Sequence, residues 1–292
     1  MKVRAVDKNQ LCEAMTQDWA DRSRRPYAQG NIAWVPVRDG EVFTHDLPEK
    51  KPYRGRGFFM LGDVAVLHGK KPGREAVEEI VSFRHPRGVI WIESLNDVTR
   101  TPRAEVLWGE AGDVCHRENG YVYELDPQKV MFSQGNREEK MRIAQLVRES
   151  PDTERVGDMF AGIGYFTIPM AGSGAMVHAM EVNPIAFDYL KRNIAHNELA
   201  KRVSPALGDC RTLLDGEYDR IVMGHFDAID MLPSVLSHVH TGSVIHLHSI
   251  GPVKDRIQDI LKGTGFSATI QVHNVKKYRP HAWHVVQDVT LI

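Results

Sequence analysis

The stretch RVGDMFAGIGYFTIPMAG, residues 155–172, decides the fold, because Asp158, Gly162 and Gly164 stand in it between a predicted strand and a predicted helix. Glycines lack a Cβ atom, so the backbone can turn sharply there and approach a ligand closely. A dinucleotide site would place a third glycine at position 167, where this chain has Thr167. The stretch therefore disfavours a nicotinamide or flavin cofactor, while a tight strand–helix turn without a ligand stays an alternative.

Strands and helices alternate around this stretch, from residue 151 to residue 292. Apolar runs predict strands at 155–160, 175–181, 203–209, 218–224, 243–249, 267–275 and 282–292. Helices are predicted between them at 164–172, 184–197, 227–239 and 252–263. Such alternation is typical of an α/β fold with a doubly wound, mostly parallel sheet, here with an antiparallel last strand.

The first half of the chain is less regular. Residues 63–150 combine short apolar runs with one helical segment, 75–83, and predict a smaller α/β domain that ends in a hinge. Residues 1–62 begin with Leu11, Ala14, Met15 and Trp19 at helical spacing and continue as turn-rich sequence. We therefore predict an N-terminal extension at 1–62, the small domain at 63–150 and the principal domain at 151–292.

Carboxylates follow the first three strands of the principal domain. Asp158 ends the first strand, Glu181 the second, and Gly208-Asp209-Cys210 the third. Parallel strands bring these ends to one edge, where a carboxylate can accept the ribose hydroxyls of a nucleoside and another acceptor can take the adenine amino group. Because no clamp for a phosphate chain accompanies them, the set favours S-adenosylmethionine (AdoMet). Ordinary strand-end polar residues remain the alternative.

At these motifs the sequence resembles a known family. The stretches FAGIGYFTIPMA (160–171), MEVNPIAFDYLKRNIAHNEL (180–199) and GDCR (208–211) resemble the AdoMet-dependent tRNA enzymes that modify guanosine-37, and the resemblance covers roughly residues 65–292. One branch contains guanine-37 N1 methyltransferases, the other the aminocarboxypropyltransferases of wybutosine synthesis. The segment SQGNREEK (133–140) resembles the second branch, and the fourth strand ends Val222-Met223-Gly224-His225, without the Asn-x-Pro element of the methyltransferases.

The resemblance implies a class I AdoMet-methyltransferase-like fold and transfer of the 3-amino-3-carboxypropyl group of AdoMet to C7 of 4-demethylwyosine-37 in the anticodon loop of tRNA(Phe), with release of methylthioadenosine. It places Ser133, Lys140, Glu181, Asp209 and Cys210 at the cofactor. Together with the residues of the glycine loop and the next helix start, Asp158, Phe160, Gly162, Gly164 and Asn183, these form the predicted AdoMet site. Sequence alone also allows Asn136 and Glu139 to form a helix capping box, which would leave Lys140 solvated.

No general base is singled out. A proton must leave C7 after transfer, and His225, Asp227 and Asp230 follow the fourth strand, but none has a diagnostic spacing. His246 and His248 would share one face of a strand, yet no third ligand stands at a recognisable spacing, so we expect no metal. Lys276, Lys277 and Arg279 surround Tyr278, a pattern that suits RNA contact or a solvated loop.

The amino-acid composition argues against several classes of protein. No run of eighteen apolar residues occurs, and the N-terminus has no apolar signal region, so we expect neither a membrane span nor secretion. The 3 cysteines form no CxxC pair, which argues against a disulfide framework and favours a reducing cytosol. The net charge of −1 does not indicate a nucleic-acid partner. We expect a monomer; the alternatives are a guanine-37 N1 methyltransferase and a non-catalytic RNA-binding protein.

Overall fold

The structure is a computed structural model that describes residues 1–47, 53–96 and 99–292. The chain divides into two compact units, Met1–Arg54 and Gly55–Ile292. The sequence prediction placed the first boundary near residue 62 and a second one near 150. Within the described residues, no helix combines the length and the apolar composition that a membrane crossing needs.

The first unit is built on a small antiparallel sheet. Its elements are β1 (Lys2–Asp7), α1 (Leu11–Thr16), β2 (Tyr27–Gln29), β3 (Ile32–Pro36) and β4 (His45–Asp46), with strand order β2-β3-β1-β4. The predicted helical spacing is confirmed only as far as Thr16, although Trp19 still packs against the same cluster around Ala14 and Val35. The strands went unrecognised because each is short and stands among turn residues.

The larger unit begins with a four-stranded mixed sheet. It contains β5 (Phe59–Leu61), β6 (Val64–His68), α2 (Arg74–Arg84), β7 (Gly88–Asn96) and β8 (Thr101–Gly109), in the order β5-β6-β7-β8. A hairpin of β9 (Val114–Glu118) and β10 (Tyr121–Leu125) follows and leads to α3 (Arg137–Glu149). Strand β9 was not predicted from the sequence.

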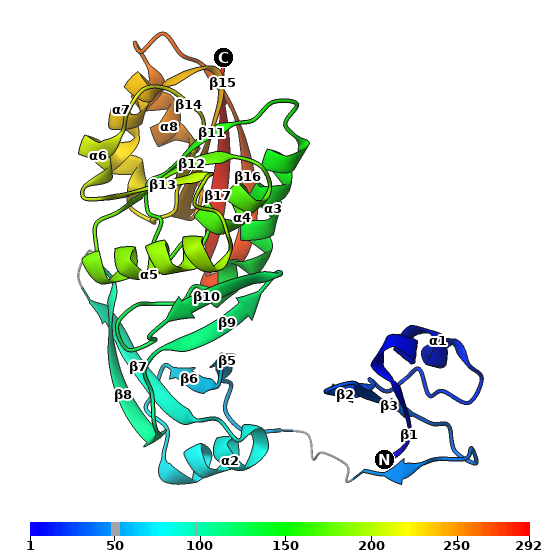
Figure 1. Ribbon diagram of the computed structural model, residues 1–292. Coiled ribbons are helices and arrows are strands. Elements are labelled where there is room, and N and C mark those ends of the chain that lie inside the picture. Colours follow the sequence, from blue (N-terminus) through cyan, green and yellow to red (C-terminus); the bar gives the residue numbers. More distant parts are fainter. Residues whose placement is uncertain (48–52, 97–98) are drawn as a thin grey trace. The chain divides into compact units, whose positions relative to one another are not determined.

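The remainder of this unit surrounds a seven-stranded sheet with the order β13-β12-β11-β14-β15-β17-β16 (Figure 1). The five parallel strands are β11 (Arg155–Asp158), β12 (Met176–Glu181), β13 (Val203–Leu207), β14 (Tyr218–Met223) and β15 (Val239–Ile250). Strand β17 (Ala282–Leu291) runs antiparallel to both β15 and β16 (Ala268–Arg279). The helices are α4 (Thr167–Gly172), α5 (Pro184–His196), α6 (Cys210–Leu213), α7 (Leu232–Val235) and α8 (Lys254–Leu261).

Side chains of alternate residues pack on opposite faces of this sheet. In β14, Ile221 and Met223 belong to one apolar cluster and Val222 to the other, as the period of two in a strand requires. The cluster on the Val222 side also includes Leu61 and Ile90 from the first sheet of the unit. The two sheets therefore share a core, which fixes the segments that lie between them.

Two predicted elements differ in the structure. The helix expected at 227–239 is three short turns, Ala228–Met231, Leu232–Val235 and Leu236–His238, before β15 begins at Val239. Pro233 lacks a backbone N–H and occupies the first turn of α7, so a continuous helix through it would lose a hydrogen bond. The helix expected at 164–172 begins only at Thr167, because the glycine turn takes up the preceding residues.

Candidate functional site

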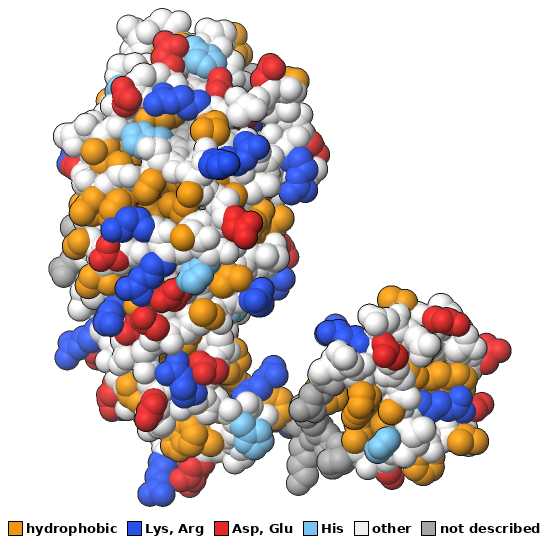
Figure 2. All heavy atoms as spheres, in the orientation of Figure 1, with side chains coloured by type: hydrophobic (Ala, Val, Ile, Leu, Met, Phe, Trp, Pro, Cys, Tyr) orange, Lys and Arg blue, Asp and Glu red, His pale blue; other side chains and the backbone are white. Residues whose placement is uncertain are grey.

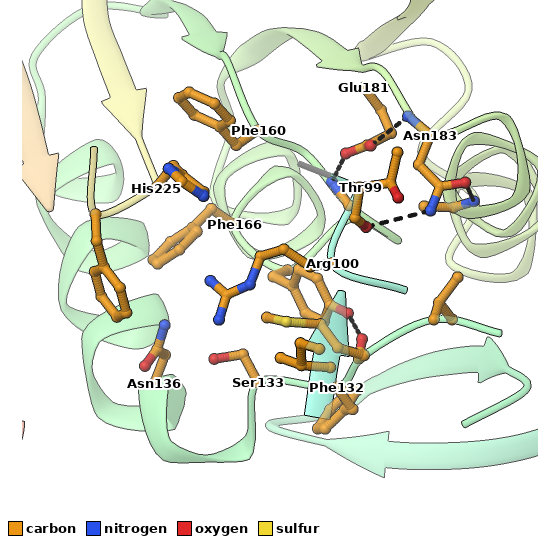
Figure 3. Close-up of a pocket in the computed structure, with 18 of the residues that line it drawn as sticks. Thr99, Arg100, Phe132, Ser133, Asn136, Phe160, Phe166, Glu181, Asn183 and His225 are labelled. Carbon is orange, nitrogen blue, oxygen red and sulfur yellow. Dashed lines mark hydrogen bonds between the residues drawn. The ribbon is translucent and has the colours of Figure 1, made fainter. Parts of the chain in front are cut away.

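A cavity of about 640 Å³ opens at the carboxyl ends of β11, β12, β13 and β14. Its walls come from the seven-stranded sheet, from the segment 127–136 that precedes α3, from the residues before β8, and from the end of β16 (Figure 3). Of the ten residues predicted at the cofactor, seven line this cavity: Ser133, Phe160, Gly162, Glu181, Asn183, Asp209 and Cys210. The other three, Lys140, Asp158 and Gly164, lie behind its walls.

The glycine loop has a conformation that only small residues tolerate. Gly162 has φ +57° and Gly164 has φ +103°. A Cβ atom on Gly162 would lie 2.4 Å from the Tyr165 ring, and one on Gly164 would lie 2.8 Å from the Ile168 side chain. Gly162 therefore borders the cavity, whereas Gly164 allows the loop to pack onto the helix behind it.

Asp158 supports this loop from below. Its side chain is fully buried and accepts hydrogen bonds from the Thr167 hydroxyl at 2.7 Å and the Phe160 amide at 3.4 Å. Burial raises the pKa of Asp158 to about 6. Thr167, the residue that replaces the third glycine of a dinucleotide site, thus ties β11 to α4.

Glu181 lines the cavity at the end of β12 with a carboxylate that already accepts two backbone hydrogen bonds. The donors are Gly162 N and Asn183 N, each at 2.7 Å (Figure 3). Burial raises the pKa of this carboxyl. Each carboxylate oxygen has two lone-pair positions, so both keep capacity for a hydroxyl of a bound ribose.

Asn183 joins two walls of the cavity. Its side-chain oxygen accepts from Ile185 N at 2.9 Å and so caps α5. Its amide nitrogen donates to Thr99 O at 3.4 Å, across to the segment before β8 (Figure 3). The position of the neighbouring Arg100 is therefore coupled to the nucleoside side of the pocket.

Asp209 and Cys210 form the wall at the end of β13. Asp209 caps α6 through Arg211 N at 2.9 Å, and its contact with the Arg211 guanidinium lowers the pKa of its carboxyl. Cys210 is buried, which raises the pKa of its thiol to about 11, so the group is a neutral packing element at ordinary pH. The two residues suit an adenine edge, with an acceptor beside an apolar surface.

Lys140 is fully buried and does not line the cavity. It donates to Glu118 Oε1 at 2.9 Å, in the hairpin strand β9 that the sequence did not reveal. Its ammonium also lies 4.7 Å from the Phe132 ring centre and 5.2 Å from that of Tyr165. The solvated Lys140 of the capping-box alternative is wrong, and Asn136 makes no side-chain cap bond.

Of the three candidate bases, His225 alone lines the cavity. Its ring stacks on Phe160 with 5.5 Å between ring centres, and burial, reinforced by the charge of Arg100, lowers its pKa. Asp227 is exposed, 3.8 Å from His225 Nδ1, and Asp230 pairs with Arg256 at the surface. A neutral imidazole at the cavity wall can accept a proton, whereas the two carboxylates lie outside the lining.

The histidine pair considered for a metal is divided between two hydrogen-bond networks. His246 contacts Asp288 Oδ1 at 2.6 Å and Arg220 Nη1 at 2.7 Å, so both of its ring nitrogens are occupied. His248 instead contacts His284 at 2.9 Å. Among the described residues, no group of three or more His, Cys, Asp or Glu side chains could hold a metal ion.

Sequence reasoning missed several lining residues. Arg100 enters the cavity from the turn before β8 at φ +50°, and Asn136 borders it beside Ser133. The cluster around Tyr278 was noticed as a possible RNA contact, and the structure places Lys276, Lys277 and Tyr278 at the cavity. No local motif marks Arg100, because its role depends on the approach of a separate sheet.

With this geometry in place, comparison with known proteins identifies the family. A family model described as the TRM5/TYW2 methyltransferase domain matches residues 114–273. The chain belongs to the TRM5/TYW2 family. The fold class and the resemblance inferred from the sequence are thereby confirmed.

Relatives of both branches of the TRM5/TYW2 family are similar to this chain. The tRNA(Phe) (4-demethylwyosine(37)-C(7)) aminocarboxypropyltransferase of Methanocaldococcus jannaschii is 34% identical over 241 residues, 78% of this chain and 95% of that protein. The tRNA (guanine(37)-N(1))-methyltransferase Trm5b of Pyrococcus abyssi is 30% identical over 286 residues, 91% of this chain and 81% of that protein. The crystal structure of M. jannaschii TYW2 in complex with AdoMet is 30% identical, with a TM-score of 0.64, and the match covers 80% of this chain and 99% of that one.

Proposed function

We propose that this chain is an AdoMet-dependent tRNA aminocarboxypropyltransferase that acts on 4-demethylwyosine at position 37 of tRNA(Phe). The observation that carries the proposal is the 34% identity to the aminocarboxypropyltransferase of M. jannaschii over 95% of that protein's length. The cavity supports it, because Glu181 and Asp209 stand at neighbouring strand ends where an adenosyl group can be bound.

The proposed reaction joins C7 of the tricyclic base to the γ-carbon of the methionine arm, breaks the bond between that carbon and the sulfonium sulfur, releases methylthioadenosine and removes the proton from C7. The choice between methyl and aminocarboxypropyl transfer depends on which carbon is held in line with the attacking atom. The protein therefore needs to bind the amino-acid arm of AdoMet as well as its nucleoside.

His225 is our candidate for the proton acceptor. It faces the cavity, and its lowered pKa keeps the imidazole neutral near pH 7. Asp227 could stabilise the imidazolium that forms, since it lies 3.8 Å from Nδ1. The assignment extends the sequence analysis, which left three candidates open.

The proposed partner is the anticodon loop of tRNA(Phe), whose base 37 must leave the stack to react. On the face of the larger unit seen in Figure 2, Lys and Arg side chains alternate with Asp and Glu and do not form one continuous basic field. Binding would therefore rest on local cations at the cavity rim, such as Lys277. We propose that the enzyme acts as a monomer in a reducing cytosol, consistent with its free cysteines.

The runner-up is methyl transfer to guanosine-37, and one observation favours it. The match to the crystal structure of P. abyssi Trm5b covers 100% of this chain, whereas the match to the crystal structure of P. horikoshii TYW2 covers 82%. A label experiment separates the two reactions. AdoMet labelled in the carboxyl carbon should label tRNA that carries the 4-demethylwyosine precursor, and methyl-labelled AdoMet should not; methyl label on unmodified tRNA would refute the proposal.

A further inference from the structure

Two half-buried cations that line the cavity have no anionic partner among the described residues, and the exposed Lys277 is a third. The two half-buried ones are Arg100, at the turn before β8, and Lys276, near the end of β16. No ion pair or hydrogen bond joins either side chain to a described carboxylate. Of the two carboxylates that line the cavity, Glu181 accepts from two backbone amides and Asp209 pairs with Arg211.

The charges of Arg100 and Lys276 act on the same space. Burial, the charge of Arg100 and that of Lys140 lower the pKa of Lys276. Burial, Lys276 and Arg100 also lower the pKa of His284 to about 4. Like charges held together in a partly dry cavity are unfavourable unless an anion joins them. The arrangement is therefore suited to a bound anionic group.

A third group has unused hydrogen-bonding capacity beside them. The side-chain oxygen of Asn136 is buried and has no hydrogen-bond partner among the described residues. Figure 3 shows Asn136 and Ser133 on one side of the Arg100 guanidinium and Phe166 on the other, away from Glu181. Cationic donors and an amide acceptor together match the carboxylate and ammonium of an α-amino acid.

We propose that Arg100 and Lys276 form an anion site that binds the α-carboxylate of the methionine arm of AdoMet, while the Asn136 oxygen accepts from its α-ammonium group. With the nucleoside held near Glu181 and the carboxylate held at Arg100, both ends of the cofactor are fixed, and the carbons between them are fixed as well. The site would thereby present the γ-carbon to the base. Only this last consequence rests on the proposed function.

A phosphate of the tRNA is the other anion that this pair could bind. Phosphates lie on the outside of a folded tRNA, where they meet exposed cations such as Lys277 before half-buried ones. The amino-acid arm, in contrast, enters the cavity with the nucleoside. The carboxylate is therefore the ligand we assign, and the experiment below separates the two sources.

The test compares AdoMet with decarboxylated AdoMet, which keeps the sulfonium and the ammonium groups but lacks the carboxylate. Dissociation constants are measured by calorimetry on the full chain without tRNA. The wild type should prefer AdoMet, and Arg100→Met or Lys276→Met should weaken AdoMet binding roughly tenfold to a hundredfold, the usual range for a hydrogen bond to a charged group. Decarboxylated AdoMet should bind the variants as well as the wild type or better, because a repelling charge is gone.

Two controls make the result specific. Arg103→Met removes a neighbouring guanidinium that pairs with Glu93 at the surface, and it should leave every affinity unchanged. Methylthioadenosine, which lacks the whole arm, should bind wild type and Arg100→Met equally, and this also reports that the variant is folded. If a variant does not fold, the proposal is tested by the wild type alone. Equal affinity of the wild type for AdoMet and for decarboxylated AdoMet would overturn the proposal.

The remaining outcomes are also decisive. An equal loss of affinity for AdoMet and for its decarboxylated form would mean that the two cations stabilise the fold and do not bind the carboxylate, which would overturn the proposal. The same variants are also titrated separately with tRNA in the absence of AdoMet; a loss of tRNA affinity with AdoMet binding unchanged would assign the site to a phosphate and overturn our assignment. Because cofactor binding is measured without transfer, methyl label on the tRNA would refute the proposed function and leave the carboxylate site standing.

Discussion

Replacing Lys140 by methionine should destabilise the protein strongly without a direct effect on the cofactor. Lys140 is fully buried, the Glu118 side chain is 4% exposed, and their 2.9 Å contact is the one that neutralises the carboxylate in the hairpin. Removing the ammonium leaves a buried, unpaired charge, which costs about 3–5 kcal/mol. Methionine is unbranched and apolar, so it can occupy the space among Phe132 and Tyr165.

The double variant Glu118→Gln with Lys140→Met removes both charges and should recover most of that loss, because a buried ion pair is often no more stabilising than neutral groups of similar size. Unfolding of the larger unit is followed in urea for both single variants and the double variant, and AdoMet affinity is measured on each folded protein. A cost below about 1 kcal/mol for Lys140→Met would refute the argument from burial. A stable double variant that binds AdoMet more than tenfold more weakly would instead show that Lys140 contacts the cofactor, as the family resemblance implied.

Three further predictions concern two residues that line the cavity and the buried Asp158 behind its wall. Glu181→Gln should weaken AdoMet binding roughly tenfold to a hundredfold, because an amide cannot accept from both backbone donors and the ribose; unchanged affinity by calorimetry would exclude the ribose role. His225→Gln should lower the rate of carboxyl-label transfer by about 10²–10⁴-fold and leave the AdoMet affinity unchanged. Asp227→Asn changes an exposed residue and should retain at least a tenth of the wild-type rate. If Asp227→Asn is instead the slower of the two variants, His225 is not the base. Burial raises the pKa of Asp158 to about 6, so the protonated form that stabilises the fold is lost as pH rises from about 4 to about 6. Over that range the free energy of unfolding of the wild type should fall by about 3 kcal/mol relative to that of Asp158→Asn. Urea unfolding of both proteins at pH 4, 5, 6 and 7 checks this, and a constant difference between them would contradict it.

The sequence predicted which strand-end residues line the cavity, because their signals are local. Phe160 and Gly162 follow one strand, and Glu181 and Asp209 end the next two. A parallel sheet brings such strand ends to one edge whatever the details of packing, so the spacing alone was sufficient.

The part of the cavity that contains Arg100 and Lys276 could not be predicted from spacing. The two residues are far apart in the chain, and both reach one cavity because the smaller sheet packs against the seven-stranded sheet. The burial of Lys140 could not be predicted, because its partner, Glu118, lies on a strand with only five residues and no alternating apolar pattern. Burial of a charge is a tertiary property, and a sequence window around the residue does not contain it.

The distribution of residues around the cavity suggests how one scaffold can support two reactions. In the proposed complex the carboxyl edge of the sheet faces the nucleoside, which is the same in both reactions. In this chain the fourth strand continues into Gly224 and His225, without an Asn-x-Pro element, and the polar groups left for the arm come from outside that edge. If Arg100 and Lys276 bind the carboxylate, the reaction is selected by the smaller sheet and the edge strand β16, and not by the carboxyl ends of the parallel strands. A change from methyl to aminocarboxypropyl transfer would then require no change in how adenosine is bound, and Arg100→Met should lower carboxyl-label transfer while methylthioadenosine affinity stays constant.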